Sequence, residues 1–404
     1  MILMNGVDYP LGSENVVDTP LRVFDTDVCA FIAELSSELL KSPASRAMPD
    51  LAALAFWGRR ASLQKMAHEF DKISNRLGRG VCFHIAPSNI PINFAFSYLF
   101  ALLAGNANIV RLPSKDFPQI DALCTIIGRV IRKYPEVEKR TAFVRYPRNN
   151  EITAAFCARA DVRMIWGGDN TIAMVKALPA SPRCVDVAFA DRYSLALLDG
   201  KAVLKAKDTQ LQRLVENFYN DTFLMDQNAC SSPQVLLWQH DDEAGRERFW
   251  NAVDSYARKK YILQDAVAVD KYTALCEEAI SNPALKSATR KTNLIYRVEL
   301  KTLTSDLMEH RGHGGFFYEY SLKNWEELFS VVTEKFQTVT CFGVDKEAFC
   351  EAVVAARLRG IDRIVPVGKA MDIGVFWDGH DLVRELSRIV RRTDALYFCC
   401  HSCI

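Results

Sequence analysis

Short, continuously apolar runs alternate along the first half of the chain with segments in which apolar residues recur every three or four positions. Continuous runs are typical of strands buried on both faces of a parallel sheet, and the periodic segments predict helices. The predicted strands are 81–86, 108–112, 140–146 and 162–166, and the predicted helices are 28–40, 48–70, 93–104, 117–133, 150–159 and 172–178. This recurrence of strand, turn and helix predicts an α/β fold with a doubly wound parallel sheet.

A proline-containing stretch at 181–193 interrupts this pattern, so we place a domain junction there and predict a first domain at 1–193. The alternation then resumes and predicts a second domain at 194–370. Its strands are expected at 195–198, 234–238, 338–343 and 361–366, its helices at 211–219, 242–260 and 346–359, and a polar segment at 282–290. We expect the remaining segment, 371–404, with a helix at 381–392, to return to the first domain or to a partner subunit.

Three turns follow successive strands of the first domain, and in open parallel sheets ligands bind beyond the carboxyl ends of the strands. Asn89 lies between two prolines in the first turn, and the second runs from Arg111 to Lys115. In the third, Gly167 and Gly168 would let the backbone approach a pyrophosphate near a helix start. The alternative is that they are ordinary turn glycines.

Cys230 is the candidate nucleophile of the second domain. It lies among small and amide residues on a tight connection between a predicted helix and a predicted strand. Such a position leaves one side open to approach, and nearby N–H groups and amide dipoles can favour the reactive thiolate. A buried structural cysteine is the alternative.

Composition narrows the class of protein. The chain has 404 residues, 49% of them hydrophobic and 25% charged, with a net charge of +1. This is an ordinary globular composition of at least two domains, and it gives no reason to expect nucleic acid as a partner. The 12 cysteines are irregularly spaced behind a start that does not resemble a signal peptide, so we expect reduced thiols in the cytoplasm. No apolar run reaches the roughly 18 residues that would span a membrane.

Common nucleotide and metal motifs are absent in their usual form. The sequence lacks G-x-G-x-x-G, the phosphate-binding G-x-x-x-x-G-K-[ST] loop and H-E-x-x-H. The cysteines and histidine at 399–403 are too closely spaced for an ordinary zinc site, so we favour a frayed tail with spare thiols and expect no metal. His84 lies in an apolar strand, where a hydrogen-bonded core histidine is expected.

From about residue 56 to 386 the motifs, taken in order, resemble the aldehyde dehydrogenase superfamily. More closely they resemble the acyl-CoA reductase family whose namesake is the fatty-acid reductase of bacterial bioluminescence (LuxC). The segments that carry the resemblance are Pro87-Ser88-Asn89-Ile90-Pro91, 105–115, Trp166-Gly167-Gly168, Gln227-Asn228-Ala229-Cys230 and Pro366-Val367-Gly368-Lys369. The resemblance implies an aldehyde-dehydrogenase-like fold with two Rossmann-type α/β domains, the cofactor bound by the first and the nucleophile carried by the second.

The resemblance also implies roles for individual residues. Cys230 would be the nucleophile, and the Asn89 amide would help to form the oxyanion hole. The residues expected at the cofactor are Arg111, Pro113, Ser114, Lys115, Gly167 and Gly168. Lys115 stands where many relatives carry a glutamate that selects NAD, so we expect NADPH. Glu319 is in the region of the carboxylate that binds the nicotinamide ribose, but its surroundings do not match that motif cleanly.

One departure from the resemblance concerns the fate of the acyl group. Aldehyde dehydrogenases carry a glutamate upstream of the cysteine that activates the deacylating water, and this chain has Ala188 at that position. Without that base, an acyl–cysteine thioester should resist hydrolysis and remain available for reduction.

The resemblance therefore implies NADPH-dependent reduction of an activated fatty acyl group to an aldehyde through an acyl-cysteine thioester. The acyl donor would be an acyl-CoA, an acyl-adenylate or an acyl-protein, with an acyl-protein synthetase subunit as a candidate partner. We also expect a homo-oligomer. An aldehyde-oxidising dehydrogenase is a rival that Ala188 disfavours. A non-catalytic subunit of an acyl-transfer complex is another, which Cys230 and Asn89 disfavour.

Overall fold

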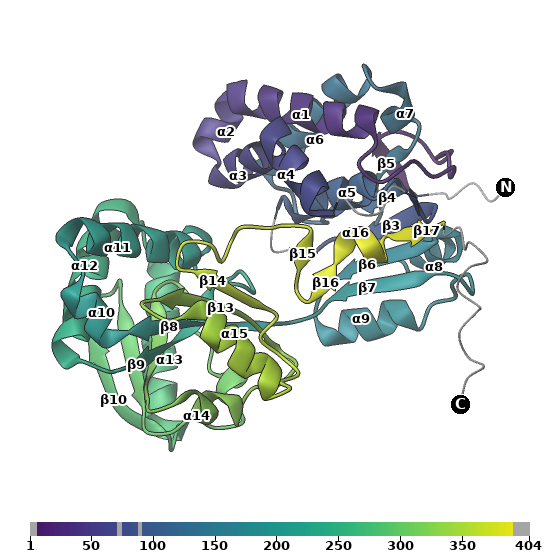
Figure 1. The fold of residues 1–404 in the computed structure, drawn as a ribbon. Coiled ribbons are helices and arrows are strands. Elements are labelled where there is room, and N and C mark those ends of the chain that lie inside the picture. The colour runs from purple at the N-terminus through teal and green to yellow at the C-terminus, as the bar shows by residue number, and fades with distance from the viewer. Residues whose placement is uncertain (1–5, 71–74, 88–90, 391–404) are drawn as a thin grey trace, which may run out of the picture. The chain divides into compact units, whose positions relative to one another are not determined.

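The computed structural model describes residues 6–70, 75–87 and 91–390, which belong to two compact units. Unit 1 combines residues 1–190 with 380–404, and unit 2 comprises 191–379. Each unit contains its own central sheet covered by helices (Figure 1). No helix in the described ranges is long and apolar enough to cross a membrane.

The sheet of unit 1 has the strand order β1-β5-β4-β3-β6-β7. All neighbouring strands are parallel except β1, which runs antiparallel to β5. The strands are β1 (Asp8–Leu11), β3 (Val81–Ile85), β4 (Ala107–Arg111), β5 (Thr141–Arg145), β6 (Val162–Trp166) and β7 (Val185–Phe189). Every residue of β3 and β6 is buried, as expected from their continuous apolar runs.

Helices cover both faces of this sheet. Helix α5 is entirely buried against β3 and β4, and Phe156 of α8 and Val175 of α9 belong to a core cluster with strand residues such as Ile165. The helices are α1 (Thr26–Lys41), α2 (Pro43–Ala47), α3 (Pro49–Trp57), α4 (Arg60–Phe70), α5 (Asn93–Leu103), α6 (Pro118–Ile131), α7 (Pro135–Glu138), α8 (Asn150–Arg159) and α9 (Asp169–Lys176). The single helix expected at 48–70 is thus two, divided at Gly58, the residue that caps α3.

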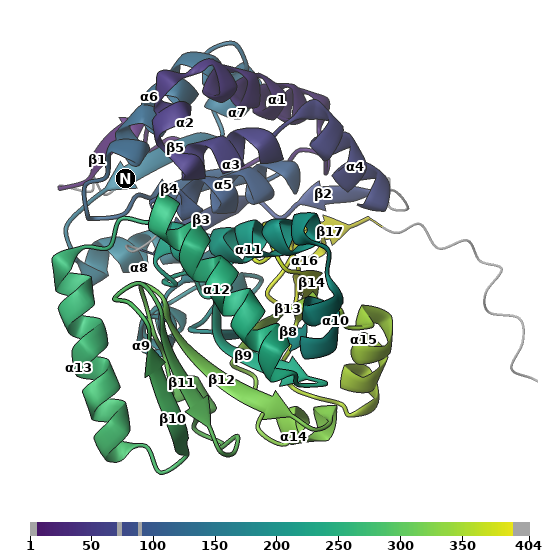
Figure 2. The ribbon, with the colours of Figure 1, turned by 90° about the vertical axis from the view of Figure 1, so that its left-hand side faces the viewer.

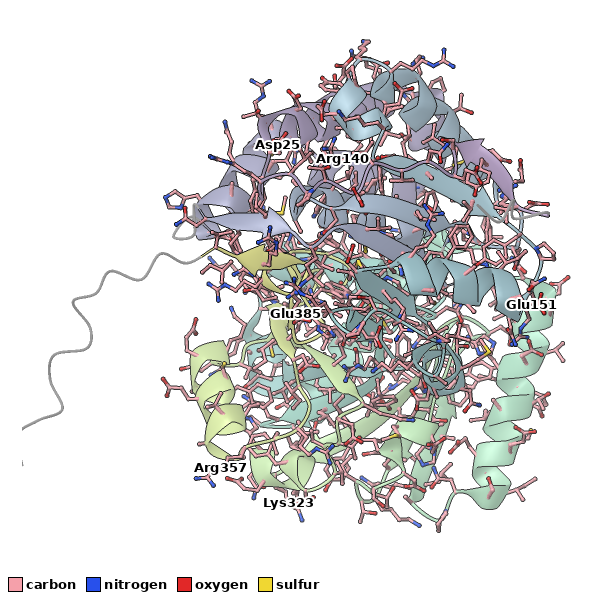
Figure 3. All side chains as sticks on the ribbon, turned by 90° about the vertical axis from the view of Figure 1, so that its right-hand side faces the viewer. Asp25, Arg140, Glu151, Lys323, Arg357 and Glu385 are labelled. Carbon is pink, nitrogen blue, oxygen red and sulfur yellow. The ribbon has the colours of Figure 1, made fainter. Side chains whose placement is uncertain are left out.

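The prediction of one helix at 381–392 is wrong. After the short strand β16 (His380–Asp381), helix α16 covers only Leu382–Glu385, and β17 (Ser387–Ile389) then pairs antiparallel with β2 (Arg76–Gly78). The guanidinium groups of Arg76 and Arg79 donate to the carbonyls of Arg384 and Glu385, each at 2.6 Å. These bonds occupy the last carbonyls of α16, and Figure 3 labels Glu385 on this segment. The tail at 399–403 lies outside the described residues.

The sheet of unit 2 has the order β10-β11-β12-β9-β8-β13-β14, and only β10 is antiparallel to its neighbour. Its strands are β8 (Tyr193–Asp199), β9 (Pro233–Gln239), β10 (Leu285–Arg290), β11 (Tyr296–Leu300), β12 (Phe316–Leu322), β13 (Phe336–Phe342) and β14 (Arg363–Pro366), with β15 (Phe376–Trp377) nearby in sequence. The helical segments are α10 (Gly200–Lys205), α11 (Asp208–Thr222), η1 (Phe223–Met225), α12 (Glu243–Lys260), α13 (Asp265–Ser281), η2 (Leu307–Glu309), α14 (Trp325–Phe329) and α15 (Lys346–Ala355).

Several elements of unit 2 had not been predicted, among them β11, β12, α13 and β10. Of these, α13 and β10 lie side by side (Figure 2). Lys271 is the one fully buried residue of α13, and five of the six residues of β10 are exposed. Neither element therefore shows the apolar periodicity from which helices and strands are predicted.

Candidate active site

Cys230 lies on a reversed loop between η1 and β9. Asp226 and Gln227 adopt left-handed backbone conformations, with φ of 49° and 59°. The Gln227 N–H bonds back to the carbonyl of Thr222, and the Asn228 N–H bonds to that of Met225. This sharp reversal brings Cys230 to the amino ends of the parallel strands of unit 2.

The buried side chain of Gln227 fixes this loop to the start of β12. Its Oε1 accepts the backbone N–H groups of Gly315 and Phe316 at 2.8 and 3.1 Å. Its Nε2 donates to the carbonyls of Phe316 and Pro233 at 3.1 and 3.3 Å. A carboxamide is required here because the position needs an acceptor and a donor together.

The backbone of Cys230 is held by two further strands. Ser194, in β8, donates its hydroxyl to the carbonyl of Cys230 at 2.7 Å. The same hydroxyl accepts the backbone N–H of Thr338, in β13, at 3.2 Å. The loop is therefore anchored to three strands of the sheet, and this rigidity suits a residue that must be presented in one geometry.

Cys230 is partly exposed as a residue, and polar side chains lie near its thiol. Burial raises its pKa to about 11, and the carboxylate of Asp378 also raises it. A hydrogen bond with the side chain of Gln337 and the charge of Arg363 act in the opposite direction. The expectation that the surroundings favour the thiolate is therefore not met, because desolvation outweighs these groups and the resting thiol is protonated at neutral pH.

Asn89 lies outside the described residues, so its predicted part in an oxyanion hole stays a prediction. Pro87 and the buried Pro91 flank it, and α5 starts at Asn93.

The turns predicted to hold a cofactor lie at one edge of the unit 1 sheet. Strands β4, β3 and β6 are parallel neighbours, so Arg111 at the end of β4 and Gly167 after β6 share the carboxyl edge. Chain order reverses between β3 and β6, and such a switch point is where open α/β sheets bind ligands. Gly168 caps α9, and a Cβ atom built there would meet nothing within 4 Å. There is thus open space beside this backbone.

Two cations on the same side are available to a ligand. The Arg111 guanidinium lies 4.3 Å from the centre of the Tyr146 ring, and Lys115 Nζ lies 5.1 Å from that of Phe117. Neither cation forms an ion pair within the described ranges. Ser114 is exposed and Pro113 is buried. The open backbone at Gly168 and the unpaired charges fit a phosphate-bearing dinucleotide.

Ala188 lies on β7, and the carboxylates near it in sequence are already occupied. Asp186 accepts a bidentate pair of bonds from Arg163 at 2.6 and 2.7 Å. Asp191 accepts a similar pair from Arg311 at 2.9 and 3.0 Å. Paired carboxylates of this kind are weak bases.

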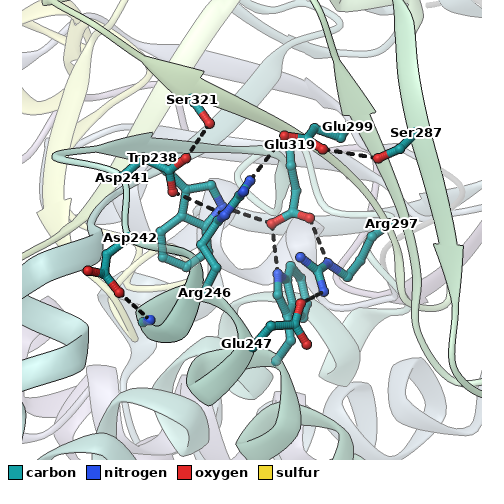
Figure 4. A network of polar contacts seen from close by, with 12 residues as sticks. Trp238, Asp241, Asp242, Arg246, Glu247, Ser287, Arg297, Glu299, Glu319 and Ser321 are labelled. Atoms are coloured by element: carbon teal, nitrogen blue, oxygen red, sulfur yellow. Dashed lines mark hydrogen bonds and ion pairs between the residues drawn. The ribbon is translucent and has the colours of Figure 1, made fainter.

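Glu319 is enclosed in a polar network in unit 2 and is not open to a ligand (Figure 4). Its carboxylate accepts the indole N–H groups of Trp238 at 2.8 Å and Trp250 at 2.7 Å, and the Arg297 Nε–H at 2.6 Å. Glu319, which lies in the region expected to supply a ribose-binding carboxylate, therefore has a structural role.

The polar groups around the thiol were missed from the sequence. Gln337, which interrupts the apolar run of β13, was the one local signal, since a buried amide in a strand needs partners. Nothing local distinguishes Arg363 or Asp378 from surface charges.

Comparison with known proteins places this chain in a family. The model of the family described as "Acyl-CoA reductase (LuxC)" matches residues 44–392. The "Long-chain acyl-protein thioester reductase" of Vibrio harveyi is 24% identical over 326 residues, which are 78% of this chain and 63% of that protein. The chain thus spans less than two thirds of this relative's length.

Solved structures show the same fold at low sequence identity. Aldehyde dehydrogenase 21 from Physcomitrella patens aligns with a TM-score of 0.59 and 13% identity, covering 90% of this chain and 84% of that one. An NAD-dependent benzaldehyde dehydrogenase from Corynebacterium glutamicum gives a TM-score of 0.61 and 11% identity, covering 94% and 95%. These similarities confirm the predicted aldehyde-dehydrogenase-like α/β fold.

Proposed function

The chain belongs to the acyl-CoA reductase (LuxC) family, and from this premise we propose that it reduces an activated fatty acyl group to an aldehyde. The acyl group would come from an acyl-CoA, an acyl-adenylate or an acyl-protein, and NADPH would be the reductant. The observation that carries the proposal is the position of Cys230, a partly exposed cysteine on a loop that three strands hold in place.

Each step needs a definite group from this chain. The sulfur of Cys230 bonds to the acyl carbon, and the donor's thiol or phosphate group leaves. Asn89 and the backbone N–H of Cys230 would donate to the carbonyl oxygen as it gains charge. When bound, NADPH supplies the hydride that reduces the thioester. The carbon–sulfur bond then breaks, the electron pair returns to the Cys230 sulfur, and the aldehyde is released.

Position 188 carries no carboxylate, which supports reduction over hydrolysis. The nearby imidazole of His380 contacts Glu385 through Nδ1 at 2.9 Å, and its Nε2 lies 3.3 Å from the Ala188 carbonyl. Ala188 cannot activate a water, and the neighbouring Asp186 and Asp191 are bound by arginines. The acyl–cysteine thioester should therefore persist until the hydride arrives. The aldehyde-oxidising alternative requires fast hydrolysis of the same intermediate.

NADPH is supported by charge at the carboxyl edge of the unit 1 sheet. Lys115 and Arg111 are cations without ion-pair partners in the described part of the chain. We propose that they bind the 2′-phosphate, and that Gly167 and Gly168 allow the close approach of the pyrophosphate.

Intact-mass spectrometry after incubation with acyl-CoAs of different lengths, without nucleotide, tests the nucleophile. Wild type should gain one acyl mass, Cys230→Ala should gain none, and Cys184→Ala should behave as wild type. Cys184 is the matched control because it is also partly buried. If Cys230→Ala is acylated normally, Cys230 is not the nucleophile. If wild type takes no acyl group from CoA or from an acyl-protein, the proposed function is wrong.

A further inference from the structure

Arg363, the first residue of β14, holds a partly buried guanidinium group surrounded by neutral acceptors. It donates to Thr338 Oγ1 at 3.3 Å and to the carbonyls of Ala370, Lys369 and Asp372 at 3.1–3.2 Å. Its guanidinium carbon lies 4.1 Å from the centre of the Trp377 ring. No carboxylate of the described chain forms an ion pair with it. A buried cation without a counter-ion is unfavourable unless a negative charge arises beside it.

A short chain of hydrogen bonds connects Arg363 to the nucleophile loop. Thr338 accepts from Arg363 and donates its backbone N–H to Ser194, and Ser194 donates to the Cys230 carbonyl. Strands β14, β13, β8 and β9 are parallel neighbours, so these residues lie together at the amino edge of the sheet. This edge holds both the cation and the thiol.

Gln337 and Asp378 complete the polar surroundings of the thiol. Gln337 donates its amide to Asp378 Oδ1 at 3.0 Å, and its buried Oε1 has no hydrogen-bond partner among the described residues. Asp378 also lies 3.1 Å from Arg192 Nε, so that its negative charge is partly balanced. The Cys230 sulfur therefore has one carboxylate opposing its ionisation, and an amide and a cation favouring it.

Two more carboxylates act on Arg363, Asp221 near the end of α11 and Asp372 in the segment after β14, and both are already occupied. Asp221 accepts the backbone N–H groups of Gly368 and Ala370, the latter at 3.0 Å. Asp372 lies 2.7 Å from the Lys369 ammonium group. With both carboxylates bound elsewhere, the positive charge of Arg363 is available to stabilise a negative charge on the Cys230 sulfur.

We propose that Arg363 is a positioning residue whose positive charge balances the negative charge that forms on the sulfur of Cys230. This rests on the proposed function, in which Cys230 is the nucleophile. On attack, the thiol proton is lost, sulfur bonds to the acyl carbon, and the donor leaves with its bonding electron pair. On aldehyde release, the hemithioacetal hydroxyl loses its proton and the carbon–sulfur bond breaks toward sulfur. The same atom bears charge before the first bond and after the last.

A purely structural role is the alternative, in which Arg363 only ties the carbonyls of 369–372 to β14. The two roles differ in one measurable property, the ionisation of Cys230. The test is the pH dependence of Cys230 alkylation by iodoacetamide, followed by peptide mass spectrometry without any acyl donor. Arg363→Gln removes the charge, Arg363→Lys restores it, and Asp378→Asn removes the opposing charge. Arg359→Gln is the matched control, because its side chain is 78% exposed.

Arg363→Gln should move the alkylation midpoint to higher pH by about one unit, slowing alkylation at neutral pH about tenfold. Arg363→Lys should recover most of this loss, Asp378→Asn should shift the midpoint to lower pH, and Arg359→Gln should match wild type. An unchanged midpoint in a folded Arg363→Gln variant overturns the inference. If that variant does not fold, an Asp378→Asn midpoint that fails to fall overturns it instead. If the wild-type protein accepts no acyl group, the proposed function is wrong. The pH dependence of Cys230 alkylation can still be measured, because that experiment uses no acyl donor.

Discussion

The groups around a buried titratable side chain decide its protonation state, and the buried His84 is one example. Its ring nitrogens lie 2.8 Å from Ser97 Oγ and 2.9 Å from Asn108 Oδ1. Burial lowers its pKa to about 4, so it is neutral at physiological pH. This confirms the core role expected from its apolar strand. At Cys230, by contrast, charged neighbours act in both directions: Asp378 adds to the effect of burial on the pKa, and Arg363 opposes it.

Cofactor preference is a property of one residue in this account. Lys115→Glu should lower the ratio of kcat/KM for NADPH to that for NADH by about 10- to 100-fold, because a hydrogen bond to a charged group contributes about 1.5–3 kcal/mol. Steady-state kinetics with both nucleotides measures the ratio. Lys65→Glu, at an exposed lysine of α4, is the control. Preference for NADH in wild type, or an unchanged ratio in Lys115→Glu, would show that this turn does not bind the 2′-phosphate.

At the residue scale, candidates for the site could be proposed from the sequence where a side chain has a local signature. Cys230 stands among small and amide residues before a strand, and Lys115 ends a strand–turn motif. Arg363 and Glu319 could not be interpreted in this way, because their roles depend on partners far away in sequence. Glu319, for example, contacts Trp238 and Trp250, which lie 81 and 69 residues away.

At the scale of elements, the Glu319 network connects β12 with β9, β11 and α12. Glu319→Gln should lower the free energy of unfolding by about 3–5 kcal/mol, because Arg297 loses its buried partner. Urea denaturation measures this effect. The KM for NADPH of the folded variant should stay at the wild-type value, since the carboxylate is closed to ligands.

Glu326→Gln, at an exposed position of α14, is the control and should change stability by less than about 0.5 kcal/mol. A Glu319→Gln variant of normal stability and sharply raised KM for NADPH would restore Glu319 as a ribose ligand.

Helices and strands were predictable from the sequence where burial of one or both faces gives their apolar residues a regular spacing. Strands β3, β4, β5 and β6 and helix α8 were predicted at nearly their observed bounds, because their apolar positions face the core of unit 1. Strand β7 was not predicted, because it lies in the stretch 181–193 that was interpreted as a domain junction. The C-terminal helix was overextended, because Arg76 and Arg79 end it from a distant segment. The exposed strand β10 had no apolar pattern from which to predict it.

At the scale of the whole molecule, the residues proposed to bind the cofactor and the proposed nucleophile belong to different units. Unit 1 carries Arg111, Lys115 and the Gly167–Gly168 turn, and unit 2 carries Cys230 and Arg363. The α/β class and the doubly wound pattern could be predicted from strand and helix alternation. The C-terminal segment was expected to return to the first domain or to a partner subunit, and the described residues 380–390 belong to unit 1. The pairing of β17 with β2 that holds them there could not be predicted, because three strand residues do not reveal their partner.

We expect the acyl group to leave Cys230 by reduction, or by exchange with a thiol such as CoA, and not by hydrolysis. Ala188→Glu should shorten the life of the intermediate, since a well-placed general base contributes a factor of about 10²–10⁴. The direct measurement is single-turnover loss of a radiolabelled acyl group from the unmutated protein at neutral pH, with and without NADPH. We expect a long-lived acyl-enzyme without nucleotide and labelled aldehyde once NADPH is added. Rapid release of labelled fatty acid without nucleotide would contradict it and favour an aldehyde-oxidising dehydrogenase.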